Sequence, residues 1–258
     1  GVSFRIVTTT ARSDDAPPSS HLFTFDVDIS GGGGASNVGS DGAGLTPLGN
    51  LTGLAPGERV YAVRFMGERL YVVTFRQVDP LFVIDVSAPA VPVLLGELKV
   101  PGYSDYLHPL NVTHLIGIGK DASNDGRVRG LKLALFDAST PSQPAEAFSL
   151  ILGDRQTHSA ALDDHKAFAF DTSMRLLTLP VRLYLSGACP TTPETSGDQS
   201  WPKLVWQGAV TWRVGERTFE LQGLVPHYDP STARPPPPSL RAACTCLLYT
   251  SDAADDAH

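Results

Sequence analysis

The sequence predicts an all-β protein built from repeated antiparallel sheets. Short apolar runs separated by polar turns follow one another along the chain, and several of them recur at a fixed offset. No stretch shows the 3.6-residue apolar period with capping residues that is typical of a helix. The chain has 258 residues, of which 42% are hydrophobic, so it can bury one large all-β core or two smaller ones.

Three segments align with one another without gaps, and each consists of two apolar runs separated by a polar turn. They are Val60–Phe75, Asp105–Lys120 and Lys166–Val181. A second match follows, in which Leu81–Gly102 aligns with Leu133–Asp154. Both copies contain an Asp-x-Ser-x-Pro turn, where Asp and Ser side chains accept backbone hydrogen bonds and Pro fixes φ. Apolar runs flank this turn, so it is expected to join two strands.

Each repeat is therefore expected to hold four strands, named a to d in chain order. Units two, three and four cover about residues 59–102, 104–154 and 166–226, with 205–213 and 217–225 as strands c and d of unit four. Unit one lacks strand a and consists of residues 4–10, 22–28 and 45–57. Four-stranded units at this period favour a β-propeller over a β-sandwich with chance similarity. The sequence predicts a β-propeller fragment of about four antiparallel blades, the first incomplete.

Domain boundaries follow from this prediction. Residues 1–230 are expected to form the partial propeller, while the Pro-rich residues 231–245 are unassigned. Residues 246–258 resemble the translation of a sequencing-library adapter and are excluded from the fold. The expectation is a metagenomic gene model that is truncated at both ends.

Composition excludes several classes of partner. The formal net charge is −7, and no run of Lys or Arg forms the basic patch that nucleic acid or an anionic membrane requires. No apolar stretch approaches the roughly eighteen residues of a transmembrane helix. Three Cys residues do not form a disulfide framework. We expect no cofactor and no nucleic-acid partner.

Several local motifs carry a family resemblance. They are Gly57–Phe65, Asp85–Ser87, Pro101–Leu110, Gly117–Asp121 and Asp164–Phe168. At these residues the chain resembles the secreted bacterial and archaeal proteins with a C-terminal β-propeller domain, which are distantly related to WD-40 repeats. The resemblance covers about residues 55–230. It implies export and a larger ring of blades, and it supplies no catalytic residues.

In a propeller the b–c and d–a connections lie on one face, around the mouth of the central channel, and function is usually found in such loops. Four segments are predicted there: Pro101–Asp105, Asp121–Gly130, Asp154–His165 and Ser186–Pro202. The third concentrates polar groups, namely Asp154, Arg155, His158, Asp163, Asp164 and His165. Such groups can ligate zinc or act as acid and base, but their spacing matches no known ligand pattern. The preferred interpretation is that Asp164 and His165 fix the loop through hydrogen bonds.

Asp105 and His108 are predicted to lie in the innermost strand of unit three, where side chains can point into the channel. An Asp/His pair there can be catalytic, and it can equally hold structural water. A second candidate is a calcium loop, because Asp121, Ser123 and Asp125 alternate as oxygen ligands do. Lys132 stands where the final Glu ligand belongs, however, and a tight Asn-Asp-Gly hairpin explains the same residues. We therefore expect no metal, with calcium as the weaker alternative.

The function expected from these observations is a non-enzymatic binding or scaffold module of an exported protein. Its partner is an unknown protein or extracellular ligand. The chain has no Gly-x-Ser-x-Gly elbow and no phosphate-binding loop. One alternative is a propeller hydrolase with acid and base groups near Asp105, His108, Asp163 and His165. The other is a structural propeller that a cation stabilises.

Overall fold

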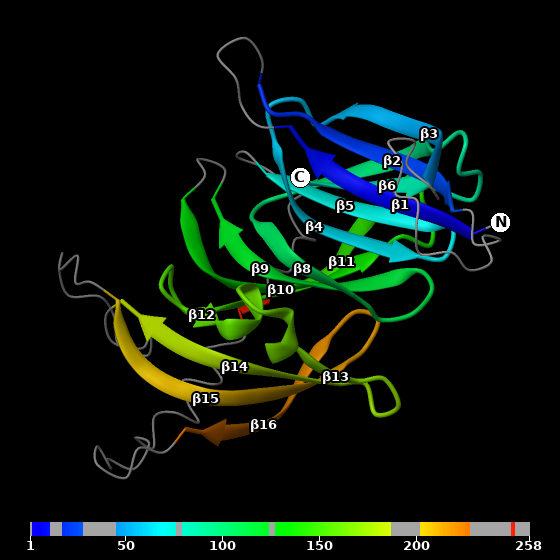
Figure 1. The fold of residues 1–258 in the computed structure, drawn as a ribbon. Helices are drawn as coiled ribbons and strands as arrows, with labels where there is room; N and C mark the ends of the chain where they lie inside the picture. The colour runs from blue at the N-terminus through cyan, green and yellow to red at the C-terminus, as the bar shows by residue number, and fades with distance from the viewer. Residues whose placement is uncertain are drawn as a thin grey trace, which may run out of the picture.

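The computed structural model describes residues 2–10, 17–27, 45–75, 79–123, 127–186, 202–227 and 249–250. Within these residues the strands form antiparallel sheets that follow one another in chain order. Figure 1 shows them as a stack running from the blue N-terminal sheet to the orange strands. No helix in the described ranges is long and apolar enough to cross a membrane.

Each sheet corresponds to one predicted blade. Blade one contains β1 (Val2–Thr9), β2 (Ser20–Val27) and β3 (Leu45–Leu54). Blade two contains β4 (Arg59–Met66), β5 (Arg69–Phe75), β6 (Asp79–Asp85) and β7 (Val93–Val100). Blade three contains β8 (Tyr103–Pro109), β9 (His114–Ala122), β10 (Val128–Asp137) and β11 (Ala145–Leu152). The predicted fold class is confirmed, including a first blade with three strands among the described residues.

Blade four departs from the prediction in its innermost strand. This blade contains β12 (His158–Ser159), β13 (Ala169–Asp171), β14 (Leu176–Leu185), β15 (Lys203–Val214) and β16 (Phe219–Pro226). Both β12 and β13 pair with β14, so they are two halves of one interrupted strand a. The predicted start at Lys166 is wrong, because strand a begins at His158. Two 3-10 turns, η1 (Ala160–Leu162) and η2 (His165–Ala167), fill the interruption.

Strands b and c, the two central strands of blades two and three, are buried on both faces. In β5, Leu70 and Val72 belong to the apolar cluster shared with blade one, whereas Tyr71 and Val73 belong to the cluster shared with blade three. Successive side chains of a strand point to opposite faces. A strand between two packed sheets therefore needs a continuous apolar run instead of an alternating one.

The last blade is buried on one face only, within the part of the chain that the structure describes. Leu179, Val181 and Leu183 of β14 pack in the cluster shared with blade three. Pro180 and Arg182, which point the other way, are exposed. The alternating sequence of β14 is that of a sheet with one solvent-facing side.

The Asp-x-Ser turn between strands c and d repeats its hydrogen bonds in two blades. The backbone N–H of Ser87 donates to Oδ1 of Asp85 at 2.8 Å, and that of Ser139 donates to Oδ1 of Asp137 at 2.8 Å. These hydrogen bonds lower the pKa of both carboxyl groups. The predicted role of the Asp side chain in this turn is confirmed.

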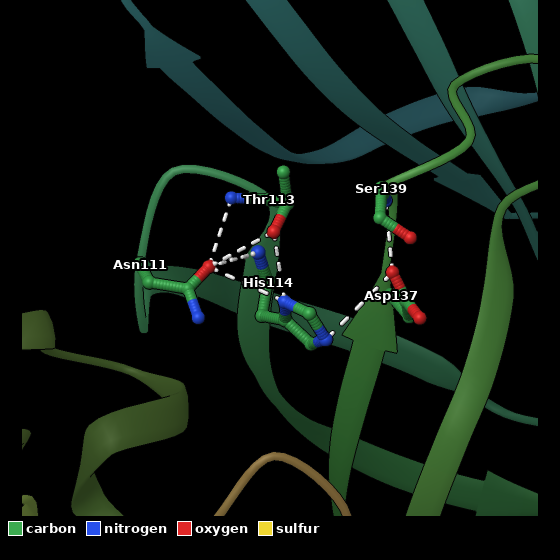
Figure 2. A network of polar contacts seen from close by, with 5 residues as sticks. All are labelled: Asn111, Thr113, His114, Asp137 and Ser139. Carbon is green, nitrogen blue, oxygen red and sulfur yellow. Dashed lines mark hydrogen bonds and ion pairs between the residues drawn. The ribbon is translucent and has the colours of Figure 1, made fainter.

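The aspartate of this turn also contacts the start of strand b, in both blades. Oδ1 of Asn111 accepts the backbone N–H of His114 at 2.8 Å, and Nε2 of His114 lies 3.7 Å from Oδ1 of Asp137 (Figure 2). In blade two the equivalent contact is an ion pair between Arg69 and Asp85, 2.8 Å long. A polar link between strand b and the c–d turn is therefore a repeated feature of the blade.

Strand a is irregular at the same place in three blades. In blade two Tyr61 is an extra residue between the pairs Val60–Thr74 and Ala62–Val73, and in blade three Asp105 is the extra residue. In blade four the interruption between β12 and β13 lies opposite the corresponding part of strand b. The gapless alignment is wrong by one residue here, because it pairs Val60 with Asp105. A bulge re-aims the side chain it carries.

The C-terminal assignments are only partly covered by the structure. Residues 231–245 lie outside the described residues, as does most of the adapter-like stretch 246–258. Within that stretch, β17 (Tyr249–Thr250) pairs with the outer edge of β11.

Gly119 in β9 allows strand a of its own blade to approach closely. A Cβ at this position would overlap the carbonyl oxygen of Tyr103, a backbone atom that cannot rotate away. We predict that Gly119→Ala lowers the free energy of unfolding by about 1–3 kcal/mol, as overpacking does. Thermal denaturation followed by circular dichroism measures the loss. Gly223→Ala is the control, because its Cβ meets open space, and an equal effect in both variants would contradict the prediction.

Candidate functional site

The polar residues predicted at the channel mouth meet where blade three faces the interrupted strand of blade four. The 3-10 turn η1 contacts both β8 and β9. As a result, the charge of Asp163, at the end of η1, acts on Asp105 of β8 and Lys120 of β9. The structure therefore brings together three charged groups from three separate elements.

Asp105 is the bulged residue of β8, and its carboxyl group is largely removed from water. Burial raises the pKa of Asp105 to about 6. The positive charge of Lys120 opposes this rise, and the negative charge of Asp163 adds to it. Asp105 can therefore gain or lose a proton in the mildly acidic range, where an ordinary Asp stays ionised.

Lys120 is a buried cation that was not predicted as a site residue from the sequence. Its Nζ donates hydrogen bonds to the carbonyl oxygens of Thr157 and Arg155, the latter at 3.5 Å. Burial lowers the pKa of Lys120, while the charges of Asp105 and Asp163 oppose that shift. Lys120 thus ties strand b of blade three to the connection that enters blade four. The sequence feature that could have identified Lys120 is a lysine within the otherwise apolar run of β9.

His158 and Asp163 form a direct pair across the start of the insertion. Nε2 of His158 lies 2.8 Å from Oδ2 of Asp163, and this contact holds the imidazole ring in one orientation. The other acidic residues of the segment bind backbone instead. Oδ1 of Asp164 accepts the N–H of Lys166 at 2.9 Å and caps η2, while Oδ2 of Asp154 accepts the N–H of Ser186. Asp154 and Asp164 fix the loop.

His108 and His165 lie among aromatic rings. The ring centroid of His108 lies 4.8 Å from that of Phe168 and 5.1 Å from that of Phe170. Burial, with a smaller contribution from the charge of Arg64, lowers the pKa of His108. His165 stacks on Tyr106 with 6.2 Å between ring centroids. The predicted grouping of Asp105 with His108 therefore divides into an electrostatic cluster and an aromatic one.

A groove of about 460 Å³ opens beside the His158–Asp163 pair, on the face of blade four that points away from blade three. Arg182 and Gln207 line it, together with the apolar side chains of Pro180 and Val225. Neither Arg182 nor Gln207 was predicted from the sequence. The sequence feature that could have identified Arg182 is a charged residue within the alternating run of β14. Only the strand pairing shows that Arg182 lies beside His158.

Two residues of the weaker calcium alternative, Asp121 and Ser123, have other partners. Nε of Arg129 lies 2.6 Å from Oδ2 of Asp121, so a cation already faces this carboxylate. The hydroxyl of Ser123 donates to the carbonyl of Arg127 at 3.2 Å, as in a closed hairpin. Asp125 lies outside the described residues. Among the described residues, no three His, Cys, Asp or Glu side chains gather in a group that could hold a metal ion.

Comparison with known proteins gives a family match. The family model described as "Beta propeller domain" matches residues 2–245. An uncharacterized protein of Methanocaldococcus jannaschii is 47% identical over 136 residues, which are 53% of this chain and 21% of that protein. An uncharacterized protein of Archaeoglobus fulgidus is 40% identical over 136 residues, again 53% of this chain and 21% of that protein. The matched part of the chain thus spans about a fifth of the length of these relatives.

One similar solved structure is a putative 6-phosphogluconolactonase from Bacteroides fragilis. It is 11% identical to this chain, with a TM-score of 0.43, and the superposition covers 88% of this chain and 68% of that one. A likeness of this size carries no argument about activity.

The pKa of Asp105 leads to a pH-dependent prediction. The folded-state pKa of about 6 lies above the ordinary Asp value of 3.8, so the folded state binds the proton more tightly. The stabilisation from the protonated carboxyl is complete below the unfolded-state pKa and is lost as pH rises through about 6. Asp105→Asn should therefore raise Tm near pH 7.5 by roughly 2–4 °C, or about 1 kcal/mol, and change it little near pH 4. A lower Tm at both pH values would show that the carboxylate is structural.

Proposed function

The chain belongs to the β-propeller domain family, and we propose that it is a non-enzymatic binding module. Its ligand site is the groove beside His158 and Asp163. One observation supports this proposal above all: an oriented imidazole and an exposed guanidinium, that of Arg182, face a groove of about 460 Å³. Small-ligand sites typically enclose about 300–1,000 Å³ and carry a few convergent polar groups.

The hydrogen bonds around the groove favour binding over catalysis. Lys120 donates to two backbone carbonyls, and Asp154 and Asp164 accept backbone N–H groups. These charged side chains make the loop around His158 rigid, and a preorganised surface loses less entropy when a ligand binds. The charged groups of Lys120, Asp154 and Asp164 therefore hold the loop in position.

A hydrolase remains the second candidate, and one observation favours it. Asp105, with a pKa of about 6, is in the range where a carboxyl group serves as a general acid near neutral pH. Asp163 is the second carboxylate within electrostatic reach. Two carboxyl groups with different environments are a common acid–base arrangement.

We place this module in a longer exported protein, with an unknown protein or extracellular ligand as its partner. The resemblance to secreted propeller proteins supports export. The relatives, of which the matched part is about 21%, support a longer polypeptide. A net charge of −7 disfavours nucleic acid as the partner.

Chromogenic substrates separate the two candidates. We predict that p-nitrophenyl acetate, p-nitrophenyl phosphate and p-nitrophenyl glycosides are hydrolysed at the same low rate by the native chain, by His158→Ala and by Asp105→Asn. The physical reason is that a binding site stabilises ground state and transition state alike. Hydrolysis by the native chain that falls at least about tenfold in Asp105→Asn would favour the hydrolase instead.

A further inference from the structure

The turn between strands a and b of blade three carries an acceptor motif for N-linked glycosylation. Asn111, Val112 and Thr113 follow the pattern Asn-x-Thr and lie between β8 and β9. The side chain of Val112 is 86% exposed, and Asn111 and Thr113 are half-buried. The motif therefore lies at the surface of the folded protein.

The hydrogen bonds of this turn determine the orientation of the Asn111 amide. The backbone N–H groups of Thr113 and His114 donate to Oδ1 of Asn111 at 2.9 and 2.8 Å, and the Thr113 hydroxyl lies 3.2 Å from the same oxygen. Only the oxygen of the amide can accept these hydrogen bonds. Nδ2 therefore points away from the turn (Figure 2), and within the described residues it is neither hydrogen-bonded nor buried.

The corresponding turn of blade four shows that the oxygen alone is enough to close such a turn. There, Oδ1 of Asp171 accepts the hydroxyl of Ser173 at 2.6 Å and the backbone N–H of Met174 at 2.9 Å. A carboxylate thus serves in blade four without an amide group. In blade three, Asn111 closes the turn with its oxygen and still presents a free amide nitrogen.

We propose that Asn111 is a site of N-linked glycosylation, with an oligosaccharide carried on a lipid phosphate as the donor. The inference goes beyond the binding function and relies on the export proposed above. In the transfer, Nδ2 forms a bond to the anomeric carbon of the sugar. The bond from that carbon to the phosphate oxygen breaks, and the lipid phosphate leaves with the electron pair. A base of the transferase takes one proton from Nδ2.

The donors around Oδ1 favour this reaction. An amide nitrogen is a poor nucleophile, because its lone pair is delocalised onto the carbonyl oxygen. When Nδ2 loses a proton, negative charge develops on Oδ1, and the donors of Thr113 and His114 stabilise it as an oxyanion hole does. These donors are already in place, since the backbone N–H of Ala138 binds the carbonyl of Thr113 at 2.9 Å and holds the turn.

A glycan at Asn111 leaves the His158–Asp163 pair uncovered. Successive strands of blade three are antiparallel, so its a–b and c–d turns lie at one end of the sheet and its b–c and d–a connections at the other. Figure 2 shows the Asn111 turn beside Asp137 and Ser139 of the c–d turn. His158 lies at the opposite end, where the chain enters blade four. Modification and ligand binding are therefore compatible.

The chain contains a second acceptor motif, which serves as an internal control. Asn50, Leu51 and Thr52 lie within β3, where Asn50 pairs in register with Phe23 of β2. Asn50 is exposed, but its amide oxygen receives no hydrogen bond from another described residue. The two motifs share the sequence pattern and differ in the turn.

Incubation of the purified, folded chain with an archaeal oligosaccharyltransferase and its lipid-linked oligosaccharide tests the proposal. Trypsin then releases residues 100–120, in which Asn111 is the only Asn, and mass spectrometry measures the fraction that carries the glycan. We expect Asn111 to be modified at least about tenfold faster than Asn50. Thr113→Ser keeps the hydroxyl and should be modified at Asn111.

Asn111→Asp is the matched variant, because its carboxylate can close the turn as Asp171 does in blade four but offers no nitrogen. It should melt like the native chain by circular dichroism and carry no glycan at this position. Synthetic peptides of residues 45–55 and 106–116 lack the fold, so we expect the transferase to modify both at similar rates.

Two results would overturn the inference. One is a folded chain that stays unmodified at Asn111 while the peptide of residues 106–116 is modified. The other is a folded chain in which Asn50 is modified as fast as Asn111. Both assays use purified components, so neither result depends on export or on the ligand of the binding module.

Discussion

The packing of each sheet against the next through apolar side chains holds this protein together. Three apolar clusters lie in sequence between blades one and two, two and three, and three and four. Blades two and three contribute to two clusters each, so their strands β5, β6, β9 and β10 carry nearly unbroken apolar runs. Each fully buried Leu or Ile side chain in them contributes about 1.5–3 kcal/mol. The sheets stack because the central strands of blades two and three have no solvent-facing side.

The same packing determines the electrostatics of the site. Asp105 lies in the bulge of β8 and Lys120 at the end of β9, where the neighbouring blade removes water from both side chains. Burial then raises the pKa of the carboxyl group and lowers that of the amine, even though each group lies near an opposite charge. The insertion in blade four supplies the remaining parts, His158 and Asp163. The groove opens on the other side of blade four, because β14 alternates between buried and exposed residues.

Much of the architecture could be predicted from the sequence, because each blade repeats the same turn chemistry. Asp85 and Asp137 occur at matching positions before Ser, and both accept the predicted backbone hydrogen bond. The one-residue error in strand a arose because the turn between strands a and b differs in length: four residues separate the paired Phe65 and Leu70, whereas five separate Pro109 and Leu115. The late predicted start of blade four has a different cause. A two-residue strand such as His158–Ser159 is too short to show a period.

The candidate site was only partly predictable. His158 and Asp163 were identified because polar residues cluster in one segment, and the structure pairs them with each other and brings Asp163 within electrostatic reach of Asp105. Lys120 and Arg182 were missed, since each is a single charge within a strand and its importance depends on cross-strand register. Register is a tertiary property that a single sequence specifies only weakly. The spacing of Asp121 also fitted the weaker calcium alternative, and the structure shows Arg129 against its carboxylate.

Native-state hydrogen exchange, followed amide by amide, tests most directly the claim that two-sided packing of the inner blades holds the structure together. Amides that open only with the core exchange at a rate set by the global stability. The account predicts the slowest exchange in β5, β6, β9 and β10, with faster exchange in β2, β14 and β15, although all of these strands lie between two hydrogen-bonded neighbours. Equal protection in all seven strands, or slower exchange in β14 and β15 than in β9 and β10, would contradict it.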